Sequence, residues 1–173
     1  MMKKLFFFKI VFIFFLAFNG KVLSEENNKT IQNNKISAFA GIFDYRRDDQ
    51  NSFMYGFQHQ NDELFKKTFL GIFSPITGGL LTADGAAYAY TGVQAEYGLG
   101  FLKLTPSFAP GYFYEGGGKK MGSPLEFKSE IKLSYDLSEN TQFGMAVNHI
   151  SNADISDTNP GSDSYTFNFL KKF

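Results

Sequence analysis

The chain has 173 residues, enough for one domain, and holds no cysteine, which excludes a scaffold stabilised by disulfides. Acidic and basic residues number 17 each over the whole chain. Four of the basic residues lie within positions 1–24, so the remainder holds 13 basic and 17 acidic residues. The resulting net charge of −4 argues against a nucleic-acid partner.

Residues 1–24 have the order of a secretory signal peptide. Lys3 and Lys4 precede an apolar run from Leu5 to Phe18, and Val22-Leu23-Ser24 offers a cleavage site. The run contains Lys9 and is shorter than the roughly 20 residues of a membrane-spanning helix. We therefore expect an exported protein, with residues 25–34 as a disordered polar leader.

The residues that follow are rich in aromatic side chains and glycine but contain no long apolar run. The chain has 22 Phe, 9 Tyr and 17 Gly. In an exported protein this composition is typical of an outer-membrane β-barrel, although a periplasmic β-sandwich is an alternative. In a barrel the polar face of each strand lines the interior, whereas in a sandwich it faces solvent. The periodicity of the strands therefore decides between the two folds.

Eight strands are predicted in the domain 35–173. The sixth alternates most regularly: Leu125, Phe127, Ile131 and Leu133 share one face, interrupted by Ser129. Its other face is mostly charged, as expected for the polar interior of a barrel. The predicted strands are 36–45, 51–60, 66–75, 86–97, 100–114, 125–136, 141–151 and 162–173.

The predicted connections alternate between short turns (61–65, 98–99, 137–140) and loops of about ten residues (76–85, 115–124, 152–161), with 46–50 as a brief exception. Short turns at one rim and long loops at the other are typical of transmembrane barrels, whose short turns face the periplasm. An all-β, eight-stranded antiparallel transmembrane barrel is the predicted fold. Side chains fill the interior of a barrel of this size, which argues against a pore.

Three polar residues continue apolar rows that should face lipid. His149 and Ser151 share the odd-numbered face of strand seven with Val147, and Asp163 shares the face of strand eight with Tyr165. A serine hydroxyl needs a base to become a nucleophile, and the base needs a partner that fixes its tautomer. The alternative is that all three are ordinary interfacial residues, since a polar group there costs only about 0–1 kcal/mol.

Five segments stand out within roughly residues 100–173: Thr105-Pro106-Ser107-Phe108, Tyr112 to Gly118, Gly122-Ser123-Pro124-Leu125-Glu126-Phe127, His149-Ile150-Ser151-Asn152-Ala153 and Asn159-Pro160-Gly161. Through these segments the chain resembles the lipid A 3-O-deacylase (PagL-type, acyloxyacyl hydrolase) family of outer-membrane barrels. The resemblance implies His149 as base, Ser151 as nucleophile and Asn152 at the position implicated in oxyanion stabilisation. Asp163 falls where members often have Glu, with Asp154 and Asp157 in the loop as weaker alternatives.

The other candidate residues favour structural roles. His59 is expected at the periplasmic end of strand two, far from Ser151. Lys119 and Lys120 follow a triple glycine in an outer loop, where solvated lysines are commoner than lysines that bind lipid A phosphates. Arg46 and Arg47 are interpreted in the same way. The sequence has no Cys/His metal spacing, no P-loop and no G-x-S-x-G motif, and predicts neither a metal nor a cofactor.

The resulting hypothesis is a metal-free serine esterase of the bacterial outer membrane that removes an acyl chain from lipid A of lipopolysaccharide. Its site would open to the outer leaflet, with acyl chains lying along the apolar residues of strands seven and eight among other outer-membrane lipids. The alternatives are a phospholipase or acyltransferase that acts on glycerophospholipid, and a structural or adhesive barrel without activity. The sequence leaves the oligomeric state open.

Overall fold

The computed structural model of the protein describes residues 34–61, 66–68 and 71–173. The predicted signal peptide and residues 25–33 of the predicted leader lie outside the described residues. Asn34, the last residue assigned to that leader, is already the first residue of a strand. The strands are β1 (Asn34–Phe43), β2 (Ser52–Asn61), β3 (Lys66–Thr68), β4 (Gly71–Thr82), β5 (Ala87–Ala95), β6 (Tyr97–Leu99), β7 (Leu102–Tyr114), β8 (Leu125–Ser138), β9 (Thr141–Ser151) and β10 (Ser162–Lys172).

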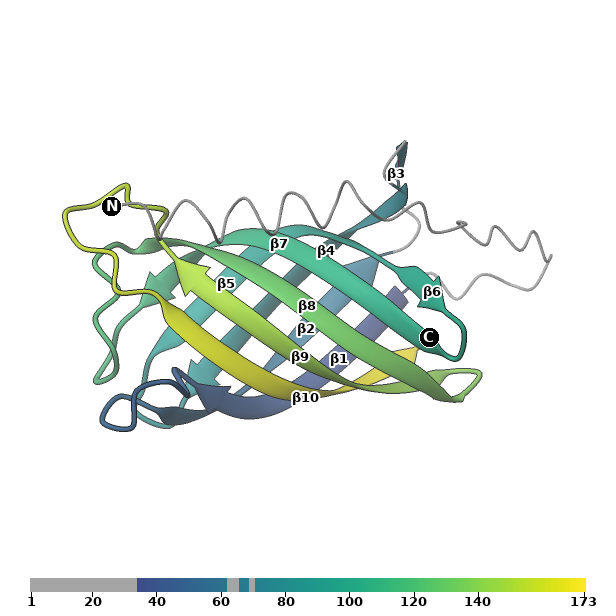
Figure 1. The fold of residues 1–173 in the computed structure, drawn as a ribbon, viewed down its shortest axis with the longest axis horizontal. Helices are drawn as coiled ribbons and strands as arrows, with labels where there is room; N and C mark the ends of the chain where they lie inside the picture. Colours follow the sequence, from purple (N-terminus) through teal and green to yellow (C-terminus); the bar gives the residue numbers. More distant parts are fainter. Residues whose placement is uncertain (1–33, 62–65, 69–70) are drawn as a thin grey trace.

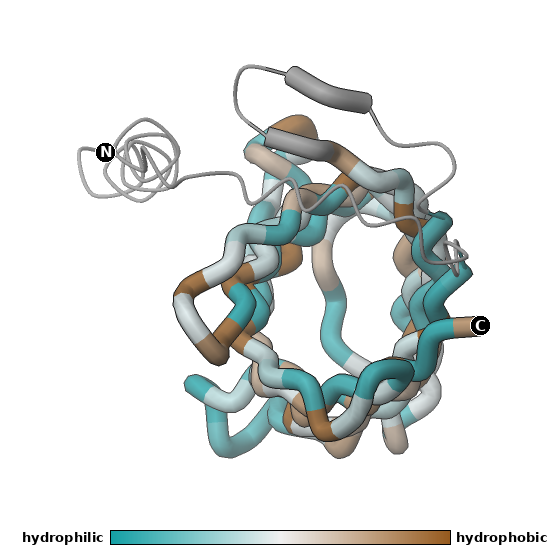
Figure 2. Tube along the Cα trace, turned by 90° about the vertical axis from the view of Figure 1, so that its right-hand side faces the viewer, coloured by the Kyte–Doolittle hydropathy of each residue, from teal (hydrophilic) through white to brown (hydrophobic). Residues whose placement is uncertain are grey.

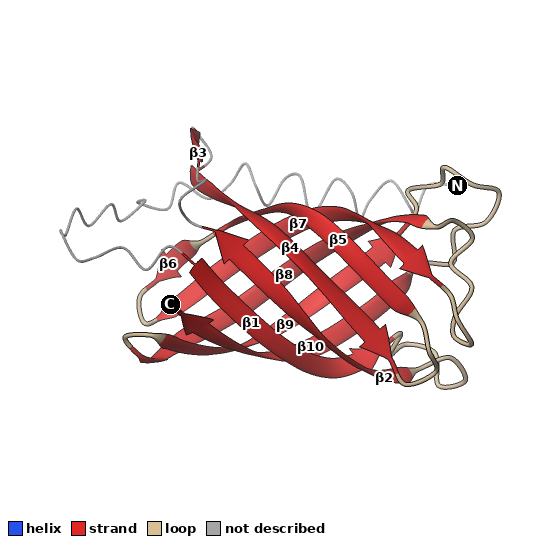
Figure 3. Cartoon of the chain, turned by 180° about the vertical axis from the view of Figure 1, so that it is seen from behind, coloured by secondary structure: helices blue, strands red, loops and turns tan. Residues whose placement is uncertain are grey.

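Eight of these strands form a closed antiparallel barrel, as the alternation predicted. The order is β2–β1–β10–β9–β8–β7–β5–β4, and pairing of β4 with β2 completes the ring. Figures 1 and 3 show the tilted strands from opposite sides, and Figure 2 shows the ring end-on. The short strand β3 pairs with β4, and β6 pairs with β7. In the described part of the chain, no helix has the length and apolar character needed to cross a membrane.

The two rims of the barrel differ. Lys35 at the start of β1 pairs with Lys172 at the end of β10. The start of the first barrel strand and the end of the last therefore lie at the same rim, here called the termini rim. The opposite rim, here called the loop rim, carries the connections 44–51, 83–86, 115–124 and 152–161. The turn between β8 and β9 at the termini rim has only two residues, 139–140.

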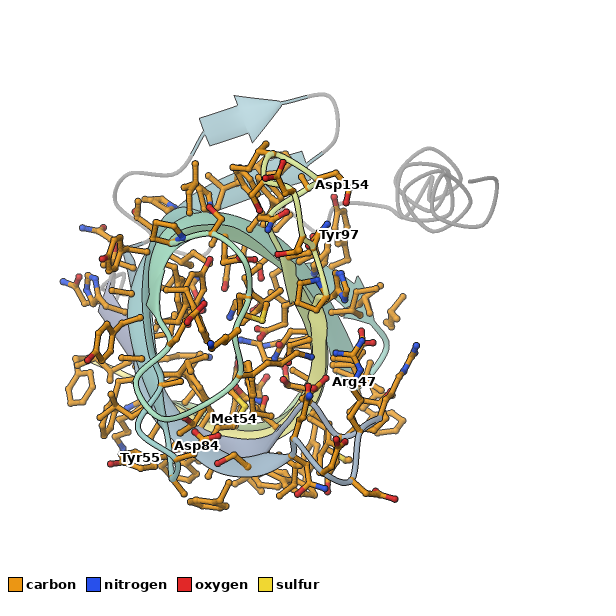
Figure 4. All side chains as sticks on the ribbon, turned by 90° about the vertical axis from the view of Figure 1, so that its left-hand side faces the viewer. Arg47, Met54, Tyr55, Asp84, Tyr97 and Asp154 are labelled. Carbon is orange, nitrogen blue, oxygen red and sulfur yellow. The ribbon has the colours of Figure 1, made fainter. Side chains whose placement is uncertain are left out.

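Side chains alternate between a packed interior and an exposed outer surface. On β2, Met54 is fully buried and Tyr55 is exposed, and Figure 4 shows them on opposite sides of the barrel wall. The even-numbered side chains of β8 from Glu126 to Ser134 are buried, which confirms the polar interior. Inside the barrel, Lys128 lies 2.9 Å from a carboxylate oxygen of Glu130. An apolar cluster also lies inside the barrel and includes Phe43, Met54, Phe113, Met121 and Ile150.

The third strand of the barrel was predicted wrongly. It was expected at 66–75 with a long loop at 76–85, but β4 continues to Thr82 and the loop that follows is short. The pair Gly78-Gly79 lies in the expected loop, whereas Pro75 lies in a strand both in the prediction and in the structure. A Cβ at Gly78 would lie only 2.6 Å from the ring and hydroxyl of Tyr90, so glycine here makes room for a large interior side chain.

Candidate active site

The strand register places His149 and Asp163 directly opposite one another. Asp163 near the start of β10 pairs with His149 near the end of β9. On the other side of β9, Ser129 of β8 pairs with His149 and Phe127 pairs with Ser151. His149, Ser151 and Asp163 all project from the outer surface and are half-buried. The parity expected from the sequence is therefore present, and the three residues lie at the loop rim.

A hydrogen bond joins the imidazole of His149 to Asp163. Nδ1 of His149 lies 2.9 Å from Oδ1 of Asp163. An ionised carboxylate only accepts hydrogen bonds, so Nδ1 carries the proton. In the neutral ring this leaves Nε2 as the basic nitrogen. Ser151 lies two residues beyond His149 on the same face, at a Cα separation of roughly 7 Å.

The loop after β1 adds contacts to Asp163 that the sequence did not indicate. The backbone N–H of Tyr45 donates to the carbonyl of Asp163 at 3.0 Å. The guanidinium of Arg46 lies 3.3 Å from Oδ2 of Asp163, the oxygen that does not face His149. Asp163 is therefore held by both its backbone and its side chain. Asp163 lies more than 100 residues along the chain from Tyr45 and Arg46, so no local sequence pattern could have revealed these contacts.

Asn152 follows Ser151 and is fully buried. Its side-chain amide nitrogen lies within hydrogen-bond distance of the Met121 carbonyl, the Thr158 carbonyl and the Ser156 hydroxyl. Its side-chain oxygen accepts from the N–H of Asp154. The amide of Asn152 thus holds the 152–161 loop in place, whereas the resemblance placed it toward an oxyanion.

The turn that follows Asn152 has an uncommon backbone. Ala153 and Asp154 both adopt the left-handed conformation, with φ of 56° and 63°. The side chain of Asn159 supports the turn from across the loop, because its oxygen accepts from the N–H of Asn152 and its nitrogen donates to Asp154. Asp154 is therefore engaged within the loop, and it is Asp163 that contacts His149.

A groove begins at His149 and Asp163 and extends over the outer surface of the barrel. Its volume is about 410 Å³. The groove runs over β8, β7 and β5, whereas the sequence placed acyl chains along β9 and β10. Short side chains such as Ser129 leave this side of His149 hollow. The apolar residues that line it include Val93, Leu104, Phe108, Ile131 and Val147.

The remaining candidate residues lie apart from His149 or serve other contacts. His59 is near the termini rim, where Nε2 lies 3.0 Å from the side-chain oxygen of Asn34. Lys120 is exposed, as expected, but Lys119 is buried and paired with Asp44. Arg47 donates to the carbonyl of Pro160 at 3.1 Å. Among the residues that the structure describes, no group of three or more histidine or acidic side chains is arranged to bind a metal ion.

Comparisons with known proteins agree with the barrel. The chain is similar to the crystal structure of the outer membrane enzyme PagL, with a TM-score of 0.63 and 17% identity over 80% of this chain and 99% of that one. It is also similar to a de novo designed transmembrane β-barrel (TM-score 0.56, 10% identity, 84% and 98% covered). Neisserial surface protein A matches with a TM-score of 0.50 at 10% identity, over 81% and 97%. No curated protein matches the sequence.

A family model gives the stronger result. The model described as lipid A 3-O-deacylase (PagL) matches residues 14–172, which is most of the chain. The match includes all of β1 to β10 and every residue of the site described above. The protein is therefore an outer-membrane β-barrel that belongs to the lipid A 3-O-deacylase (PagL) family.

Proposed function

We propose that the protein is a serine esterase that removes the 3-O-linked acyl chain from lipid A in the outer leaflet, with Ser151, His149 and Asp163 as its catalytic triad. The hydrogen bond between His149 and Asp163 carries this proposal, because it leaves Nε2 as a base on the face that presents Ser151. Family membership supplies the substrate class.

In the proposed reaction, Oγ of Ser151 attacks the acyl carbonyl carbon while Nε2 of His149 takes the hydroxyl proton. The tetrahedral intermediate collapses, the bond to the sugar oxygen breaks, and His149 returns the proton to that oxygen. Water then attacks the acyl-enzyme by the same route and releases the fatty acid. Asp163 stabilises the imidazolium that forms twice in each cycle.

Oxyanion stabilisation is assigned to the turn that follows Ser151. Within this turn the N–H of Asn152 donates to Asn159 and the N–H of Asp154 donates to the Asn152 side chain, so the N–H of Ala153 is the donor that this proposal assigns to the oxyanion. In this proposal Asn152 acts by holding the turn against Met121, Ser156 and Thr158. Removal of a single oxyanion donor typically costs about 10²–10³ in rate.

The groove supports a lipid substrate that stays in the membrane. Its apolar residues include Val147 and Ile131, which are exposed on the outer surface of the barrel. An acyl chain that lies in the groove has its ester end beside His149, and the sugar is then at the loop rim. The reacting ester therefore reaches the triad without the substrate leaving the bilayer.

Lipid A mass spectrometry after expression in a host that lacks the activity tests the proposal. We expect loss of one ester-linked acyl chain with the native protein. Ser151→Ala and His149→Ala should abolish the loss, with rates at least about 10⁴-fold lower, while barrels still fold. Unchanged lipid A, with cleavage or acyl transfer on glycerophospholipids, would establish the alternative enzyme, and no change in any lipid would favour a structural barrel.

Two matched variants sharpen the test. Ser129→Ala removes the other outward hydroxyl beside His149, and His59→Ala removes the histidine near the termini rim. Both should retain deacylation. If Ser129→Ala is inactive while Ser151→Ala is active, the nucleophile is Ser129 and the proposed triad is wrong.

A further inference from the structure

Lys119 is a buried lysine in the loop between β7 and β8. Its side chain is only 2% exposed, and that of its partner Asp44 is 3% exposed. The ammonium of Lys119 donates to the carboxylate of Asp44 and to the backbone carbonyl of Gly161. Burial lowers the pKa of Lys119, and the Asp44 carboxylate opposes that effect by favouring the charged form. One ammonium thus connects three loops of the rim.

Asp44 leads from this ion pair to Asp163. Asp44 follows the last residue of β1 and has φ of 53°, and its carbonyl accepts the N–H of Arg47 at 3.1 Å. The next two residues are those that hold Asp163: Tyr45 by its backbone N–H and Arg46 by its guanidinium. A shift of Asp44 would therefore move the contacts to Asp163.

Gly161 leads from the same ammonium to His149. Gly161 has φ of 62°, and a Cβ added to it would lie 2.9 Å from Cε1 and 3.4 Å from Nε2 of His149. Its backbone thus lies against the edge of the ring that holds the basic nitrogen. Lys119 fixes this backbone through the carbonyl of Gly161.

We propose that the buried Lys119–Asp44 ion pair is a positioning device for catalysis, which sets His149 through Gly161 and Asp163 through the loop after β1. This inference rests on the proposed function, because positioning matters only if His149 and Asp163 take part in the reaction. Neither Lys119 nor Asp44 touches the substrate in this proposal. A buried charge left without its partner is costly, so the loops stay where both contacts are made.

The test compares Lys119→Met and Asp44→Asn with two matched controls. Asparagine tolerates the left-handed backbone at position 44. Lys120→Met and Asp48→Asn change the exposed neighbours of the same loops. Three quantities are measured on purified barrels: kcat and KM on lipid A in mixed micelles, and the rate at which a small fluorophosphonate labels Ser151. The labelling rate reports activation of the serine without lipid binding.

Both pair variants should lower kcat and the labelling rate by about 10- to 100-fold with KM nearly unchanged, because small displacements of catalytic groups have effects of this size. The controls should match the native protein. Lys119→Arg should recover part of kcat. The double variant Lys119→Met/Asp44→Asn should be no worse than the poorer single variant, because it leaves no buried charge unpaired. If Lys119→Met does not reach the folded, heat-modifiable form, the double variant replaces it.

Native kcat and labelling in the folded pair variants would overturn the positioning role, and so would a rise in KM alone. The proposed function fails by a different result, namely activity that survives Ser151→Ala or His149→Ala. Inactive Ser151→Ala together with fully active Lys119→Met would therefore reject the ion pair and keep the triad.

Discussion

Two groups of ionisable residues lie on neighbouring strands of the barrel, and of these two only the outward-facing group lies on the outer surface. Lys128 and Glu130 on β8 point inward, are almost fully buried and contact one another. His149 on β9 and Asp163 on β10 point outward and are half-buried beside a groove. A change of one position along a strand moves a side chain from one group to the other. Charge and burial alone would favour the interior group as the candidate active site, whereas access to lipid favours the outer group.

Among changes to the outer group, substitution of Asp163, the proposed triad acid, should have the largest effect on activity. Asp163→Asn should lower turnover by about 10⁴-fold, because an amide can select the wrong imidazole tautomer and cannot stabilise imidazolium. Asp163→Glu should retain activity, since family resemblance places Glu at this position. Deacylation assays on purified barrels provide the measurement. Normal turnover in Asp163→Asn, with a loss in Asp154→Asn or Asp157→Asn, would transfer the role to a loop aspartate.

Loss of the Asn152 side-chain contacts that support the turn should have the second-largest effect on activity. Asn152→Asp keeps the shape of the side chain but replaces its NH₂ group, which faces Met121 O and Thr158 O, with a carboxylate oxygen. The repulsion should displace the turn and lower kcat by about 10²–10³-fold. Asn140→Asp, in the exposed turn at the termini rim, is the control. Equal rates for both variants would show that Asn152 has no part in the oxyanion site.

Filling the groove should lower activity on lipid A less than substitutions in the proposed triad or in the turn. Val147→Trp fills it beside His149, and kcat/KM for lipid A should fall by about tenfold. A short-chain, water-soluble ester should be hydrolysed at a nearly native rate. Met145→Trp adds the same ring two residues away on the same face of β9 and should leave both substrates unaffected. Equal effects of the two variants would mean that the acyl chain lies elsewhere.

The interior group should affect stability and leave catalysis unchanged. Lys128→Met leaves the Glu130 carboxylate buried without its contact at 2.9 Å, which should reduce the free energy of unfolding by about 3 kcal/mol. Denaturant titration in lipid vesicles measures this loss, and the exposed residue Lys171 supplies a control, Lys171→Met, with little effect. A fall in kcat per folded molecule would break the distinction between the two groups.

The sequence predicted those features that depend on neighbours along the chain. Alternation identified the strands and the charged interior face of β8, and parity placed His149, Ser151 and Asp163 on one surface. Register then brings His149 to Asp163, because a ten-residue loop joins two strands of one hairpin. The same local reasoning misassigned Gly78 to a loop, because its place in β4 depends on the side chain of Tyr90 across the sheet.

Features formed by distant segments were not predictable. Lys119 was expected to be solvated because it lies in an outer loop. Nothing near it in the sequence indicates that Asp44 and Gly161 will enclose it. Arg46 lies 117 positions before Asp163 in the printed sequence, yet contacts it once the barrel is closed. The course of the groove depends on which short side chains become neighbours on β7 and β8. Such contacts are set by the packing of loops and strands, for which residue spacing carries no signal.

The pairing of β1 with β10 has a consequence for the biogenesis of the enzyme. This pairing is the seam at which the first and last strands of the chain meet, and the site lies across it: Asp163 begins the last strand, while Tyr45 and Arg46 follow the first. A chain that has formed every hairpin but has not joined its ends still holds Ser151, His149 and Asp163, without the contacts that fix Asp163. In the proposed mechanism, full activity therefore requires closure of this seam.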